Sequence, residues 1–294
     1  MGVTMSERHV TMCWPNYIDE STLSGGQWSA SLPLSQLMSA TTADVAESVG
    51  LDPANTQFDI TLPRFRTIAV VALNNHNLSV SARCRVTMFR DTQAQNEIWN
   101  SGWQNAWPAI YSTAELNWED SNFWSGRPYE EDRKDFTPLG WVFLDRLQVA
   151  RRVRVEIDDP TNSDGAVRLG RCFLGNSWQP TYNASYGIQY GYDIGTEFET
   201  AGNANMTEYA DVKTPKRTVS FSLDHLDADE GARRALALQR QQGLHGEVLY
   251  TEFLEITNPV AFSRAFIGRL SSADPLAHPY YATYTNSISI KEIL

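Results

Sequence analysis

Residues 151–178 read RRVRVEIDDPTNSDGAVRLGRCFLGNSW, and this stretch decides the fold of the first half of the chain. Charged residues alternate with Val153, Val155 and Ile157, which is the period-two pattern of a strand that buries one face. Residues 158–165 are rich in Asp, Pro, Asn and Gly, which favour turns. The alternation resumes at Val167, Leu169 and Phe173. We therefore predict an antiparallel hairpin that closes a first domain.

The composition describes a globular protein of two domains. The chain has 294 residues, 42% hydrophobic and 20% charged, which is enough for two separate cores. The residue pattern changes after Trp178, where tyrosines interspersed with glycines follow, so we place the domains at residues 1–178 and 179–294. The formal net charge of −11 repels phosphate and argues against a protein that reads nucleic-acid sequence.

Cysteine usage and hydropathy favour a protein made in the cytoplasm. The three cysteines, Cys13, Cys84 and Cys172, have no metal-like spacing, and their odd number argues against a disulfide framework. The first residues lack the apolar stretch of a secretory signal, and no run of eighteen apolar residues predicts a membrane segment. We expect folding in a reducing compartment.

Short strands dominate the expected first domain. Residues 1–31 show little periodicity and predict an extended arm or short strands. Strands are predicted at 56–62, 66–73 and 82–89, with a turn at 74–79. Residues 92–140 are irregular and contain Trp99, Trp103, Trp107, Trp118 and Trp124. Many short strands with almost no helical periodicity predict an all-β sandwich.

The second domain is expected to be a β-sandwich with one packed helix. Val219, Phe221 and Leu223 alternate within a strand at 216–223. The helix is predicted at 227–242, with Asp227 as N-cap, an apolar side of Ala232, Ala235, Leu236 and Leu238, and Gly243 at its end. Residues 201–213 are expected to form a polar loop. Further strands are predicted at 247–256, 261–270 and 281–290.

The sequence carries no motif for catalysis, and we expect no enzyme activity, cofactor or metal. The five histidines are scattered, and no phosphate-binding loop, dinucleotide fingerprint or nucleophile elbow is present. The segment 158–165 could hold a structural calcium through Asp159, Asn162 and Asp164, but Pro160 breaks the ligand spacing and a turn is the favoured interpretation.

The tryptophans of residues 99–124 allow two interpretations. Trp103, Trp107, Trp118 and Trp124 could form a platform on which sugar rings stack, as in a carbohydrate-binding module that recognises a cell-surface glycan. Alternatively they fill a core or a subunit interface, where Trp is favoured, and this use is the more common one.

The order of elements resembles the distal tail proteins at the tail tip, or baseplate, of bacteriophages with long, non-contractile tails. The resemblance covers most of the chain from about residue 56, except residues 92–140. It rests on the run 170–175 (GRCFLG) followed by Trp178, Pro180, Asn183, Tyr186 and Gly187, on LNNHNLS at 73–79, and on the later strand, helix and GRL segment at 268–270.

The resemblance implies a structural virion protein without catalysis. The first domain would be a galactose-binding-like jelly roll, and the second would be a tail-tube-like sandwich that forms a homo-oligomeric ring, with a hexamer favoured and a trimer possible. Its partners would be the tail-tube protein, the baseplate hub and the tail-fibre proteins. For the ring interface we choose residues 217–223, 227–242 and 281–290, in particular Val219, Phe221, Leu236, Arg240, Ile288 and Ile290. For an outward contact we choose the loop 99–135.

Overall fold

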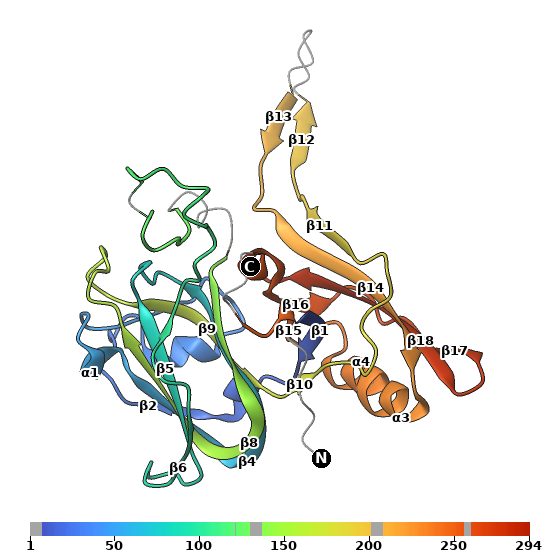
Figure 1. Cartoon of the computed structure of the whole chain (residues 1–294), viewed down its shortest axis with the longest axis horizontal. Helices are drawn as coiled ribbons and strands as arrows, with labels where there is room; N and C mark the ends of the chain where they lie inside the picture. Colours follow the sequence, from blue (N-terminus) through green and yellow to red (C-terminus); the bar gives the residue numbers. More distant parts are fainter. Residues whose placement is uncertain (1–7, 121, 130–136, 201–207, 256–259) are drawn as a thin grey trace. The chain divides into compact units, whose positions relative to one another are not determined.

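The computed structural model describes the chain except residues 1–7, 121, 130–136, 201–207 and 256–259, and it confirms the predicted mostly-β fold class. The chain divides into two compact units (Figure 1). The first contains Met1–Pro180, Glu247–Ile267 and Leu294, and the second contains Thr181–Gly246 and Gly268–Ile293. The first break lies two residues beyond the boundary expected at 178. Residues 247–267, which the sequence grouped with the second domain, belong to the first unit.

The first unit is organised around one curved sheet that closes on its own core. Its strand order is β3-β9-β4-β8-β5-β6, with β2 added to β4 and β7 added to β5. The two longest strands are β4 and β8, and their mutual register shifts twice, which lets the sheet bend around the core (Figure 1). The strands are β2 (Thr22–Ser24), β3 (Ala46–Glu47), β4 (Phe58–His76), β5 (Arg83–Phe89), β6 (Glu97–Asn100), β7 (Gln104–Asn105), β8 (Leu139–Asp158) and β9 (Arg168–Gly175).

The predicted hairpin of residues 151–178 is wrong in its pairing. Both strands exist, and the segment between them is a turn, but β8 and β9 are not neighbours. They lie on either side of β4, so that Val71 pairs with Val142 of β8 and with Leu174 of β9. The period-two pattern identifies the buried face of a strand, but it contains no information about which strand lies beside it. The separately predicted strands 56–62 and 66–73 likewise form parts of the single strand β4.

The core of the first unit contains the residues that the alternation selected. Val153, Val155 and Ile157 of β8 and Val167 and Leu169 are all buried. Burying each such aliphatic side chain stabilises the fold by roughly 1.5–3 kcal/mol. They pack with Ile60, Ile68, Val86, Met88 and Cys172 from the other strands in one continuous cluster.

A second group of strands in the first unit explains why residues 247–267 belong to it. Strand β1 (Arg8–Cys13) pairs with β10 (Ser177–Trp178) on one side and with β15 (Val248–Phe253) on the other. The unit also contains short helical turns at η1 (Tyr17–Glu20), η2 (Leu34–Met38), α1 (Pro53–Thr56) and α5 (Ala261–Arg264), so the predicted strand 261–270 is wrong in its first half. Only β16 (Phe266–Leu270) remains of that strand, and the unit boundary falls within it.

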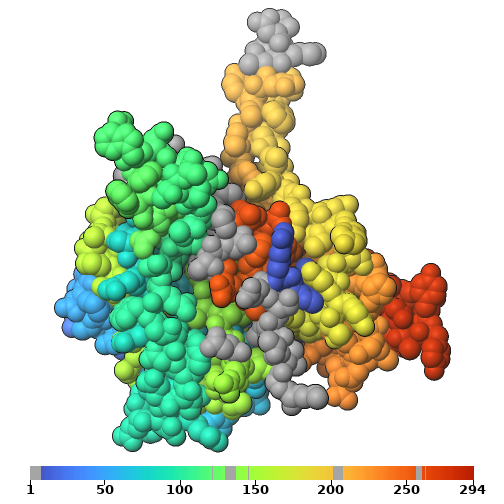
Figure 2. Space-filling view, viewed as in Figure 1, coloured from blue at the N-terminus to red at the C-terminus, as the bar shows by residue number. Residues whose placement is uncertain are grey.

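The second unit is built on strand β14. The order here is β16-β18-β14-β11, with β17 paired to β18. Burial along β14 alternates as predicted, with Val219, Phe221 and Leu223 inside. The strands are β11 (Gln189–Asp193), β12 (Glu197–Thr200), β13 (Glu208–Asp211), β14 (Lys216–Leu226), β17 (Ala277–Tyr280) and β18 (Thr283–Glu292). β12 and β13 form a separate antiparallel pair that extends away from β14 (Figures 1 and 2). The loop expected at 201–213 is therefore wrong at 208–211, which form β13, and its residues 201–207 lie outside the described residues.

The predicted helix is present, with an irregular middle. It consists of α3 (Ala228–Glu230), the π-helical turn η3 (Gly231–Ala235) and α4 (Leu236–Gln242). The N-cap is Asp227, whose side chain accepts a hydrogen bond from the Glu230 amide at 2.7 Å, and Gly243 ends the helix with a positive φ of 53°. Ala235 and Leu238 are buried as expected, but Ala232 and Leu236 are exposed. No helix in the described part of the chain is long and apolar enough to cross a membrane.

Candidate functional site

Trp107 does not belong to a surface platform. Its side chain is 6% exposed and is part of the core of the first unit. The indole Nε1 donates a hydrogen bond to the Leu78 carbonyl at 2.9 Å, and the ring meets the edge of His76 at a centroid distance of 5.3 Å. Both contacts hold the indole inside, so the prediction of Trp107 as a glycan contact is wrong.

The Trp103 side chain is partly exposed and makes cation–π contacts with two arginines. The guanidinium of Arg85 lies 4.7 Å from the centre of the ring, and that of Arg83 lies 5.6 Å from it. Arg85 is itself fixed by two hydrogen bonds to Glu156, at 2.6 and 2.7 Å. Cations held close to an aromatic ring stabilise its orientation. Trp103 is therefore an oriented ring, 39% exposed, beside β5.

Trp118 and Trp124 are the most exposed tryptophans of the irregular region, at 78% and 91%. Trp124 meets Phe123 edge-on at 5.1 Å. The turn beneath them is tight: Gly126 has a φ of 61°, and a Cβ there would lie 2.4 Å from the Tyr111 carbonyl oxygen. Part of the predicted outward contact, residues 130–135, lies outside the described residues.

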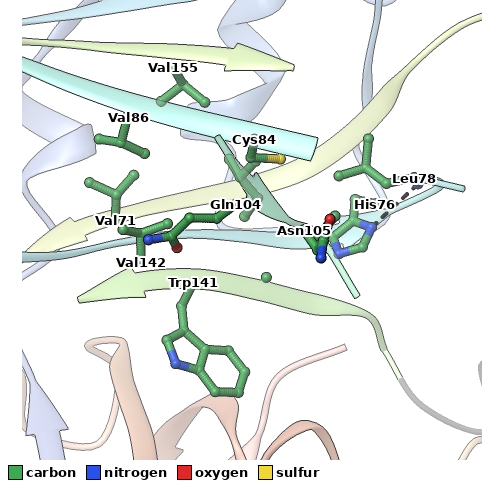
Figure 3. Close-up of a pocket in the computed structure, with 13 residues that line it drawn as sticks. Val71, His76, Leu78, Cys84, Val86, Gln104, Asn105, Trp141, Val142 and Val155 are labelled. Carbon is green, nitrogen blue, oxygen red and sulfur yellow. Dashed lines mark hydrogen bonds between the residues drawn. The ribbon is translucent and has the colours of Figure 1, made fainter. Parts of the chain in front are cut away.

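A small apolar cavity lies within the first unit. Its volume is ≈ 30 Å³, about one water molecule, and its wall includes Val71, Val86, Val142 and Val155 (Figure 3). Cys84 lies at its edge, where burial first and the charge of Asp159 second raise the pKa of the thiol to about 12. A cavity of this size and polarity holds no organic ligand, and the thiol stays protonated.

A larger, open hollow of ≈ 530 Å³ lies between the β4–β5 connection and the β8–β9 connection. Polar side chains dominate its wall, which consists of His76, Asn77, Leu78, Ser79, Val80, Trp107, Pro138, Thr161, Asn162 and Ser163. The sequence indicated only turns here. No motif pointed to the hollow, because it forms where two connections distant in sequence meet.

Asp159 and Asp164, the carboxylates considered for calcium, form hydrogen bonds that stabilise the turns in the structure. Asp159 is fully buried and accepts hydrogen bonds from the Ser79 amide at 2.9 Å and from Asn162 at 3.0 Å. Asp164 accepts instead from Asn77, at 2.9 Å. These side chains are used to join the two connections. The described residues contain no cluster of three or more His, Cys, Asp or Glu side chains suited to a metal.

Four of the six residues chosen for a ring interface are buried. Val219 pairs with Ile290, and Phe221 pairs with Ile288, across the β14–β18 ladder. All four are at most 4% exposed, because they fill the covered face of that ladder. Their prediction as interface side chains is wrong. Leu236 and Arg240 are exposed, and with Ala232, Ala237 and Gln239 they line a surface hollow of ≈ 540 Å³ on the helix.

The hairpin of β12 and β13 is exposed along its whole described length, and we call it the arm. All eight residues of its two strands are exposed, including Phe198 at 67% and Tyr209 at 62%. Strand β11, at the edge of the sheet, continues this surface with Tyr190, Tyr192 and the following Ile194. The sequence signal that could have found it is the alternation of acids and aromatics at 197–199 and 208–211.

Comparison with known proteins adds no family. No protein-family model and no curated protein match the chain. Among solved structures, the chain is similar over 55–56% of its length to a fucose-binding module of Streptococcus pneumoniae (10% identity, TM-score 0.36, 94% of that chain). It is also similar to the family 32 carbohydrate-binding module of NanJ from C. perfringens, in complex with galactose (9% identity, TM-score 0.36, 99%). A third match is the lectin-binding domain of Lectinolysin in complex with Lewis b (13%, 0.35, 96%). No functional conclusion rests on likenesses at this level.

Proposed function

We propose that this chain is a structural protein that assembles with copies of itself through its second unit. Specifically, it forms a ring at the tail tip of a long-tailed bacteriophage and joins the tail tube to the baseplate hub and fibres. The observation that carries the proposal is the arm, whose strands are exposed on both faces. The order of elements that resembles distal tail proteins supplies the particular setting.

A partner would stabilise the arm for physical reasons. A two-stranded hairpin alone in water is marginally stable at best, and it needs further strands or a packed face. Here both faces of the arm expose large side chains, and the outer edge of β11 pairs with none of the described strands. Exposed apolar surface next to an unpaired strand edge favours association with another chain. In a protein whose copies assemble, these groups become buried.

The buried parts of the second unit suit a rigid ring element. Arg217 and Glu292 form an ion pair between β14 and β18, and both side chains are at most 6% exposed. The amide of Arg217 also donates to Glu292 at 2.9 Å. These contacts fix the register of the two strands, so a neighbouring copy would meet a preformed surface, which lowers the entropy lost on binding.

Light scattering of the purified protein over a range of concentrations tests the proposal. We expect the mass to approach that of six copies, or three, and then to stop rising, because a ring closes. A mass that stays at one copy, also when isolated phage tail tubes are added as a template, would contradict the proposal.

A second candidate function is glycan recognition by the first unit, and the exposed tryptophans favour it. Trp103 offers an oriented ring face, and Trp118 and Trp124 offer uncovered ones. Binding to a glycan array should weaken at least about tenfold in the Trp103→Ala or Trp124→Ala variant if stacking contributes. Absence of binding by the wild-type protein would remove this candidate and leave the structural one.

A further inference from the structure

We propose that the arm of one copy docks on the exposed helix face of the next copy, so that ring contacts run head to tail. The inference rests on the proposed function and specifies the two surfaces that meet. The occupant of the helix hollow is a second copy of this chain, and the contact pairs Phe198 with Leu236 and Glu208 with Arg240.

The arm is acidic. Its strands carry Glu197, Glu199, Glu208 and Asp211, and Glu197 is paired with Lys213. The register places Glu197 directly opposite Asp211, and like charges in that position destabilise a hairpin. Among the described residues, Glu199, Glu208 and Asp211 enter no ion pair. A cationic neighbour would therefore stabilise the arm.

The helix supplies the opposite charge. Residues 228–242 contain Arg233, Arg234 and Arg240, and the two acidic residues, Asp229 and Glu230, lie in the first turn, away from the exposed face around Leu236 and Arg240. Arg233 pairs with Asp229 at 2.6 Å, whereas Arg234 and Arg240 enter no ion pair within the described parts of the chain. The small side chains of Ala232 and Ala237 leave the hollow in which Leu236 is 41% exposed. A π-helical turn in the same segment, Gly231–Ala235, is a feature that often marks functional positions.

The spacing of the groups matches across the two surfaces. In the arm, Phe198 lies opposite Ala210, and Thr200 lies opposite Glu208, so Phe198 and Glu208 share one face as diagonal neighbours about 7–8 Å apart. On the helix, Leu236 and Arg240 are four residues apart, which also places them on one face at about 5–6 Å. Each surface thus offers one apolar and one charged group at a similar distance.

The fold separates the two surfaces within one chain. The arm precedes β14, which begins at Lys216, and the helix follows directly after β14 ends at Leu226. Eleven strand residues span about 35 Å, and in Figure 1 the arm extends from the end of β14 opposite α3 and α4. An arm in this position does not cover its own helix. Two different surfaces at opposite ends make a heterologous contact, which forms rings when the rotation closes.

Mixing two singly defective variants gives a sharp test. Phe198→Asp damages the arm and leaves the helix intact, and Leu236→Asp does the reverse. Each variant alone should fail to form rings. Mixed at equal amounts, they should form dimers of one copy each and nothing larger, because only one productive contact remains. Rings formed by either variant, or no dimers in the mixture, would overturn the inference.

Charge exchange provides the second measurement and its control. Glu208→Arg and Arg240→Glu should each weaken association at least about tenfold, and both together in one chain should restore it. The matched control Glu199→Arg changes the same charge on the opposite face of the arm and should leave association near the wild-type level. Equal loss in the control, or no rescue in the double variant, would contradict the proposed contact.

A cross-link separates failure of this inference from failure of the proposed function. A chain with Phe198→Cys is mixed with a chain with Leu236→Cys under mild oxidation, with Tyr209→Cys in place of Phe198→Cys as control. A disulfide specific to the first mixture, in protein that forms no ring, would support the contact and contradict the ring. Rings of the wild-type protein, combined with no such disulfide in the mixture of the two Cys variants, would support the ring and contradict the contact.

Discussion

Trp107 and Trp124 are the same residue type in the same irregular region, yet the structure uses them in opposite ways. Trp107 is enclosed beside His76 and satisfies its indole N–H within the chain, whereas Trp124 is 91% exposed. Removing a large buried aromatic leaves a cavity, and removing an exposed one leaves none. At the residue scale, burial rather than residue type decides the consequence of a substitution.

Urea unfolding of two alanine variants checks this difference. Trp107→Ala should lower the free energy of unfolding by about 3–5 kcal/mol, because core contacts and the hydrogen bond to Leu78 are lost. Trp124→Ala should change it by less than about 0.5 kcal/mol. Equal effects of the two substitutions would contradict the placement of Trp107 in the core.

The ion pairs of Asp59 make the free energy of unfolding depend on pH. Burial alone would raise the pKa of its carboxyl, but Arg152 at 2.6 Å and Arg154 at 3.0 Å lower it overall. A carboxyl with a lowered pKa in the folded state stabilises the fold above its unfolded pKa of about 3.9, and this stabilisation is lost as the pH falls through the folded value.

Denaturant melts between pH 7 and pH 2 measure this contribution. The wild-type free energy of unfolding should fall below about pH 4, and Asp59→Asn should make that fall less steep. Arg152→Gln, which leaves Arg154 in place, should have a smaller effect in the same direction. A wild-type and an Asp59→Asn profile that run parallel would refute the assignment.

At the element scale, a buried cluster of charged side chains joins the segment 247–267 to the rest of the first unit. Arg171 of β9 is 2% exposed and binds Glu247 at 3.0 Å and Asp19 at 2.7 Å. Burial alone would lower the pKa of this guanidinium, and the two carboxylates raise it overall. Asn16 donates a further hydrogen bond to Glu247 at 3.0 Å. These contacts, with the β1–β15 pairing, join three distant segments in the first unit.

Glu247→Gln should therefore lower the free energy of unfolding by about 3–5 kcal/mol, because Arg171 would keep a buried charge with one partner fewer. Glu47→Gln removes an exposed pair with Arg168 and should cost less than about 1 kcal/mol. Thermal or urea unfolding of both variants gives the comparison. A Glu247→Gln protein as stable as the Glu47→Gln protein would argue against the cluster.

Removal of the arm should affect assembly and not stability, because its strand residues are exposed and add nothing to the buried core. Replacing residues 195–212 by a short glycine-containing turn should leave the melting temperature of the isolated chain within about 2 °C and abolish self-association. Circular dichroism and light scattering on one sample record both. Loss of folding, or assembly that persists without the arm, would contradict its role.

The sequence predicts individual strands and helices better than it predicts which strands pair. The physical reason is that the patterns of an element depend on residues close together in the chain. Alternation around Val219 and Val155 correctly identified buried faces, and Asp227 and Gly243 correctly marked the ends of the helix. The position of β4 between β8 and β9, and the pairing of β1 with β15, depend on contacts between residues far apart in the chain. The surfaces of the arm and the helix depend on which faces remain uncovered, which only the assembled fold determines.

At the scale of the whole molecule, the second unit contributes exposed acidic surface as well as a buried core. The chain has a net charge of −11, and part of that charge lies on an arm that faces no cation of its own beyond Lys213 among the described residues. A ring of such chains would bury the arms and keep an acidic surface. An acidic channel would let DNA pass without binding it, because like charges repel.

Electron microscopy of the wild-type protein tests the central claim most directly. Class averages of negatively stained particles should show closed rings with sixfold or threefold symmetry, and the same images of the protein without its arm should show single copies. Wild-type particles that are single copies or open chains, at concentrations well above those of the scattering measurements and in the presence of tail tubes, would contradict a ring-forming tail protein.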